Sequence, residues 1–133
     1  MLTTQLPLFK PGFRLSLIDC IVILLAIVGI IHFYEVDKVF SYIIGIIVSH
    51  YFLFCNITRM SRVPELIWAS SFIILCTLSL QLNIIPIFIS FIFAMLITVV
   101  LVVLETRKPY YHGVFWQKLN PSLPSWFKEN NSK

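Results

Sequence analysis

Four long apolar runs dominate this sequence and restrict its possible folds more than any other feature. They cover residues 15–34, 39–57, 66–82 and 86–104, which is more than half of the 133 residues. A hydrocarbon core about 30 Å thick needs roughly 20 helical residues to cross it, and each run approaches that length. Because backbone amides cannot stay unpaired in lipid, a spanning segment is either a helix or part of a closed barrel.

The runs are continuous, which favours helices over a barrel. A transmembrane barrel strand alternates polar and apolar residues, whereas residues 21–25 and 97–101 are apolar with hardly a break. Only 12% of the chain is charged and 59% is hydrophobic, which excludes a soluble globular domain, a disordered chain and a nucleic-acid-binding module. The sequence therefore predicts an all-α integral membrane protein whose four transmembrane helices pack as a small antiparallel bundle.

We expect these helices at about 15–34, 39–57, 64–82 and 86–104. The third is expected to begin at Pro64, because proline is well tolerated in the first turn of a helix. The remaining residues form an N-terminal tail (1–14) and a C-terminal tail (105–133) that mixes aromatic residues with lysines. Such a tail suits the membrane interface, and it equally suits docking to a partner protein.

The basic residues predict the orientation of the chain. If the runs alternate across the membrane from a cytoplasmic N-terminus, Lys38 alone faces the far side, and the other nine lysines and arginines are cytoplasmic. This positive-inside bias places both termini in the cytoplasm. The net charge of +4 is then a topology signal, with anionic lipid headgroups as the counter-charge and no nucleic-acid partner. We expect a bacterial cytoplasmic membrane.

One charged residue, Asp19, falls inside a predicted span, and an ionisable group at membrane depth faces protein or water. It lies about 6 Å from the cytoplasmic end of its helix, and His50 lies about 10 Å from the same side. We hypothesise that they pair, either as a structural clasp or in a proton or cation relay. The alternative is that Asp19 reaches back to water while His50 bonds a backbone carbonyl or a serine. Helices three and four add polar side chains at similar depth, which completes a predicted polar layer of Asp19, His50, Ser70, Ser71 and Thr98.

Small residues four apart mark faces where helices can approach closely. The predicted packing stripes are Ser41, Gly45 and Ser49 on helix two, and Ser90 and Ala94, continued by Thr98, on helix four. Near the cytoplasmic headgroups, four further residues are candidates for contact with lipid or a partner, namely Arg59, Arg62, Trp116 and Trp126.

No catalytic, cofactor or metal motif stands out. A bis-histidine haem does not fit, because His32 lies near the far end of helix one, at a very different depth from His50. The leading hypothesis is a non-enzymatic structural or accessory subunit of a larger membrane complex, with a protein partner or a homo-oligomer. One alternative is an oligomeric small transporter or channel with Asp19 and His50 in its pathway. A weaker alternative is a membrane enzyme acting on a lipid or quinone.

Overall fold

The computed structural model describes residues 10–131, and all regular structure in that range is helical. Four helices are long and apolar enough to cross a membrane, which confirms this part of the prediction. In chain order the elements are α1 (Leu17–Val36), α2 (Lys38–Phe52), the π-helix η1 (Leu53–Ile57), α3 (Arg62–Leu80), α4 (Ile87–Thr106), α5 (Trp116–Leu119) and α6 (Leu123–Asn131). The ends of the long helices lie within two residues of the expected bounds if η1 is counted with α2.

Local sequence explains where the first helices begin and turn. Ser16 caps α1 in a reciprocal capping box with Asp19, so the amides of Ser16 and Asp19 both have an acceptor. A single residue, Asp37, then separates α1 from α2, and its carboxylate accepts from the amides of Val39 and Phe40. So short a connection forces α1 and α2 to lie side by side and antiparallel.

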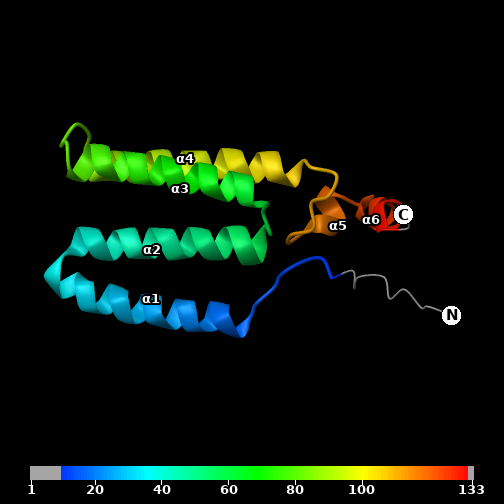
Figure 1. Cartoon of the computed structure of the whole chain (residues 1–133), viewed down its shortest axis with the longest axis horizontal. Helices are drawn as coiled ribbons and strands as arrows, with labels where there is room; N and C mark the ends of the chain where they lie inside the picture. The colour runs from blue at the N-terminus through cyan, green and yellow to red at the C-terminus, as the bar shows by residue number, and fades with distance from the viewer. Residues whose placement is uncertain (1–9, 132–133) are drawn as a thin grey trace.

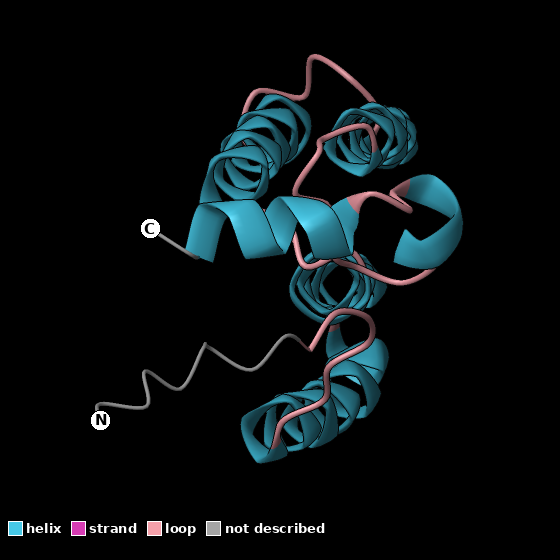
Figure 2. Cartoon of the chain, turned by 90° about the vertical axis from the view of Figure 1, so that its right-hand side faces the viewer, coloured by secondary structure: helices cyan, strands magenta, loops and turns pink. Residues whose placement is uncertain are grey.

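The four long helices are stacked in an order set by this connectivity. The first helix lies at the edge beside α2, and α3 and α4 lie together on the other side of α2 (Figures 1 and 2). Of the most apolar 18 residues of α1, only 6% are buried, against 22% in each of the other three long helices. The bundle therefore has one poorly covered helix.

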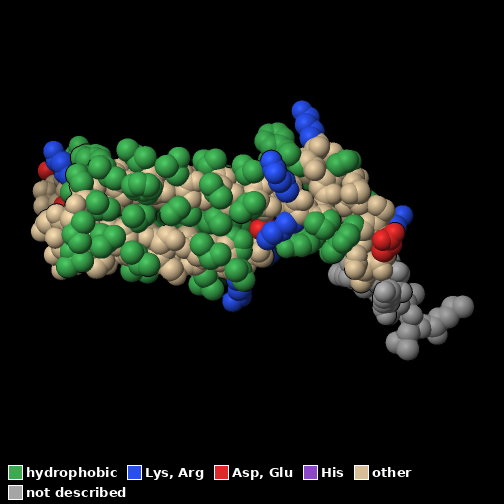
Figure 3. Space-filling model, turned by 90° about the horizontal axis from the view of Figure 1, so that it is seen from above, with side chains coloured by type: hydrophobic (Ala, Val, Ile, Leu, Met, Phe, Trp, Pro, Cys, Tyr) green, Lys and Arg blue, Asp and Glu red, His purple; other side chains and the backbone are tan. Residues whose placement is uncertain are grey.

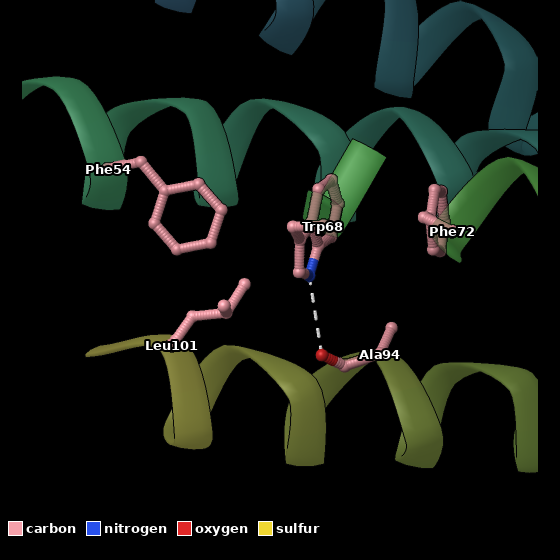
Figure 4. Close-up of a cluster of buried hydrophobic side chains, with 5 residues drawn as sticks. All are labelled: Phe54, Trp68, Phe72, Ala94 and Leu101. Atoms are coloured by element: carbon pink, nitrogen blue, oxygen red, sulfur yellow. Dashed lines mark hydrogen bonds between the residues drawn. The ribbon is translucent and has the colours of Figure 1, made fainter. Parts of the chain in front are cut away.

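The buried core lies between α2, α3 and α4. Trp68 and Phe72 stack with ring centroids 5.0 Å apart, and the Trp68 indole donates to the Ala94 carbonyl at 3.3 Å (Figure 4). Phe54 from η1 and Leu101 from α4 close the cluster. A tryptophan whose N–H is bonded in this way can be buried without leaving an unsatisfied donor.

The C-terminal residues fold against the rest of the chain. We call residues 107–131 the end segment; α6 lies across the end of the bundle (Figure 2). The Val114 amide donates to the Ile57 carbonyl at 2.8 Å, and the Gly12 amide donates to the His112 carbonyl at 2.7 Å. Tyr111 is buried, and burial raises the pKa of its hydroxyl, which donates to the Val114 carbonyl. The C-terminal tail thus packs against the end of η1 and against the residues that precede α1.

The surface differs between the long helices and the end segment. Hydrophobic side chains cover the helical part of the face seen in Figure 3, and basic side chains gather toward its ends and around the end segment. Both ends of the described chain lie at the end segment's side of the bundle (Figure 1).

Candidate functional site

Hydrogen bonds from the start of α1 and from η1 hold the Asp19 carboxylate in place. Its Oδ2 accepts from the Ser16 amide and hydroxyl, both at 2.7 Å, and from the Asn56 side-chain amide at 2.8 Å. The Tyr51 hydroxyl lies 3.5 Å from Oδ1. The carboxylate is 7% exposed, and these donors replace the water it would otherwise need.

The predicted hydrogen-bonded pair of Asp19 and His50 is therefore wrong. His50 bonds its own helix instead, with Nδ1 2.7 Å from the Ile46 carbonyl, so Nδ1 carries the proton. Its ring stacks on Trp68 at 4.3 Å, and its buried Nε2 has no hydrogen-bond partner among the described residues. Both residues lie in the half of the bundle next to η1, but position along a helix carries no information about the direction in which a side chain points.

The remaining members of the predicted polar layer do not form a network either. Ser71 donates to Ile67 and Thr98 donates to Ala94, each at 2.8 Å to the carbonyl four residues earlier. Ser70 is exposed on α3. Hydroxyls commonly bond in this way within a helix, so residues at one depth need not meet.

The small-residue stripes lie mainly at helix contacts. The Ser41 hydroxyl donates to the Ile30 carbonyl of α1 at 3.0 Å, and a side chain on Gly45 would face Ile30 at 3.7 Å. On α4, the fully buried Ser90 donates to the Leu75 carbonyl of α3 at 3.2 Å, and Ala94 is buried in the core. Ser49 is exposed and lines an open groove.

The most chemically varied site lies at the η1–α3 connection, beside the end segment. A pocket of about 630 Å³ there is lined by Cys55, Arg59, Met60, Arg62, Glu65, Leu66, Ala69 and His112. Arg59 has a left-handed backbone (φ 48°), which turns the chain sharply between η1 and α3. Burial lowers the pKa of its guanidinium, and the neighbouring charge of Arg14 lowers it further.

A second pocket, of about 420 Å³, is adjacent to the first, since Arg59 and His112 line both. Trp126 and Tyr110 contribute aromatic rings to it, and Lys10 a further basic group. The guanidinium of Arg59 donates to the Lys10 carbonyl at 2.6 Å, which ties Lys10 to the η1–α3 connection.

Of the four predicted contact residues, three line these two pockets. Arg59 and Arg62 line the first, and Arg59 and Trp126 line the second. Trp116 is the first residue of α5 and lies half-buried in the end segment.

Several important residues escaped the sequence reasoning. The pattern Ser16-x-x-Asp19 before an apolar run is a capping-box signal that would have placed Asp19 at a helix start. Asn56 follows Ser49 by seven residues, a spacing that would place both on one face of an α-helix, yet Asn56 is buried against Asp19. The sequence gives no signal for Gly113. This residue lies close to the backbone carbonyls of Ile57 and Thr58, which are more than fifty positions away in the chain.

Among the described residues, no three histidine, cysteine, aspartate or glutamate side chains lie close enough to hold a metal ion. Glu105, buried at the end of α4, is neutralised by Lys108 and accepts from the Ser61 amide at 3.2 Å. Its hydrogen bond raises the pKa of Lys108. The hydrogen bond from Ser61 to Glu105 fastens the start of α3 to the end of α4.

No protein-family model, curated protein or solved structure matches this chain.

Proposed function

We propose that this chain crosses a bilayer four times with both termini in the cytoplasm and serves as a non-enzymatic accessory subunit of a larger membrane complex. The bacterial cytoplasmic membrane is the proposed location. The basic residues support this orientation, because Lys38 lies at the opposite end of the bundle from Arg59, Arg62 and the end segment.

The observation that carries the subunit role is the exposed position of α1. This helix packs on α2 and leaves apolar residues exposed around most of its circumference, among them Leu17, Leu24, Leu25 and Ile31. An edge helix that packs chiefly on α2 leaves a broad apolar face that a neighbouring subunit can cover.

A groove beside α1 gives the partner a defined place. It has a volume of about 500 Å³ and is lined by Ile30, Tyr34, Ser41, Tyr42, Gly45, Ile46, Ser49, Phe88, Phe91 and Met95. Its lining from α2 includes Gly45 and the exposed Ser49. Small residues let a second backbone approach closely in lipid, so a partner's transmembrane helix fits this groove.

The hydrogen bonding of Asp19 favours the same conclusion over the transporter alternative. A carboxylate that accepts from Ser16 and Asn56 is already satisfied, and it fixes α1 to η1. A substrate or proton would have to displace these donors. The arrangement supports a clasp that sets the position of α1.

Purification of the tagged full-length protein in mild detergent tests this proposal. We expect a stoichiometric partner with the native protein and its loss with Ser49→Leu, because leucine would fill the groove. Ser70→Leu is the matched control, since Ser70 is exposed on α3 outside every described pocket. A clean homo-oligomer or monomer without a partner would contradict the subunit role, as would equal partner loss in both variants.

A further inference from the structure

The 630 Å³ pocket at the η1–α3 connection has two chemically different walls. Its charged side chains are Arg59, Arg62 and Glu65, and His112 of the end segment adds an imidazole. The remaining wall consists of Cys55, Met60, Leu66 and Ala69. The pocket therefore offers a cationic end and an apolar end to whatever occupies it.

The two arginines form no ion pair with a described carboxylate, although Glu65 lines the same pocket. Among the described residues, the one salt bridge joins Lys108 to Glu105, so neither Arg59 nor Arg62 is neutralised by a carboxylate within 4 Å. Arg59 is half-buried, which increases the cost of leaving its charge without an anion. Guanidinium groups bind phosphate oxygens through several parallel N–H donors.

The apolar end distinguishes a lipid from a free ion. Leu66 and Ala69 lie on α3 about 6 Å and 10 Å along the helix from Arg62, toward the middle of the proposed span. Inorganic phosphate would leave this wall uncovered. A phospholipid bound through its phosphate would lay the start of an acyl chain along it.

We propose that this pocket binds the phosphodiester group of an anionic phospholipid of the phosphatidylglycerol type. Arg59 and Arg62 hold the phosphate, and Glu65 accepts from the hydroxyls of the glycerol headgroup. Leu66 and Ala69 contact the acyl chain, and His112 closes the pocket when the end segment is docked. The inference rests on the membrane placement proposed above, but it is independent of a protein partner.

Lipid titration of the full-length protein in neutral detergent tests the site, with bound lipid counted by native mass spectrometry. We expect dioleoyl-phosphatidylglycerol to bind about tenfold more tightly than dioleoyl-phosphatidylcholine. Arg62→Gln should remove most of this preference. Arg62 is exposed and makes no described side-chain hydrogen bond, so this variant is expected to fold. Arg59→Gln is a less specific test, because it also removes the hydrogen bond to the Lys10 carbonyl. Arg107→Gln is the control, since Arg107 is exposed at the same end but lines no described pocket.

Each contrary outcome identifies a different error. Equal binding of both lipids would overturn the proposal, and so would equal loss in Arg107→Gln, which indicates general charge attraction. Displacement of the lipid by millimolar inorganic phosphate would show a free-phosphate site instead. Phosphatidylethanolamine binding as tightly as phosphatidylglycerol would refute selectivity for an anionic headgroup. If the lipid preference holds but no protein partner is found, only the subunit role fails.

Discussion

At the scale of single residues, the hydrogen bonds of Asp19 explain why a carboxylate lies in the first apolar helix. Asp19 lies in the first turn of α1, where its carboxylate completes a capping box and accepts from Asn56. A negative charge is favoured near a helix N-terminus, because the unpaired amides there carry partial positive charge. One side chain therefore starts α1 and joins it to the end of η1.

Asp19→Ala should lower the free energy of unfolding by about 1–3 kcal/mol, because it leaves buried donors of Ser16 and Asn56 without an acceptor. Asp19→Asn should cost less, since its carbonyl oxygen can still accept from both. Titration of SDS into dodecylmaltoside micelles, followed by helical circular dichroism, measures this difference.

Asp37→Ala is the matched control for that measurement. Asp37 also caps a helix, but it is exposed and accepts only from local amides, so its loss should cost about 1 kcal/mol. If Asp19→Ala were no more destabilising than Asp37→Ala, the bond between α1 and η1 would not matter for stability.

At this scale the sequence predicts the position of a residue along its helix but not the direction in which its side chain points. Hydropathy and rise per residue placed Asp19 and His50 in the same half of the bundle. The π-helix Leu53–Ile57 advances less per residue around its axis than an α-helix, so a period of 3.6 misplaces Asn56 relative to Ser49. The sequence carries no signal for this change of period.

At the scale of elements, the long helices are predictable and the end segment is not. Length and hydropathy are local properties, and they located α1 to α4. The docking of residues 107–131 depends on distant backbone groups, such as the Ile57 carbonyl that accepts from Val114. Its aromatic residues indicated an interface but not which surface they would cover.

Gly113→Ala should loosen the end segment. A methyl group there would lie 2.6 Å from the Thr58 carbonyl oxygen and 2.8 Å from that of Ile57, and neither backbone group can move easily. Overpacking of this kind costs about 1–3 kcal/mol. Limited trypsin digestion in micelles should therefore cut the variant faster at Lys118 than the native protein.

Gly29→Ala controls for the loss of a glycine. Its added methyl group would meet Ile44 at 3.9 Å, an ordinary contact, so digestion should proceed at the native rate. Native-rate cleavage of Gly113→Ala would show that the end segment does not depend on this close approach.

At the scale of the whole molecule, the protein combines four long apolar helices with an aromatic and basic end segment at one end. The apolar surfaces of α1 to α4 fit lipid or a partner's helix, and the end segment with Arg59 and Arg62 fits the headgroup level. The accessory role, the lipid pocket and the function of the Asp19 clasp all depend on four crossings of one bilayer.

Paired reporter fusions in bacterial cells test whether the chain crosses the membrane four times with both ends in the cytoplasm. Alkaline phosphatase and green fluorescent protein are each fused after Lys133 and, in separate chains, inserted at Asp37 between α1 and α2. Four crossings with cytoplasmic ends predict fluorescence without phosphatase activity after Lys133, and phosphatase activity without fluorescence at Asp37. Phosphatase activity after Lys133, or fluorescence at both positions, would contradict the account.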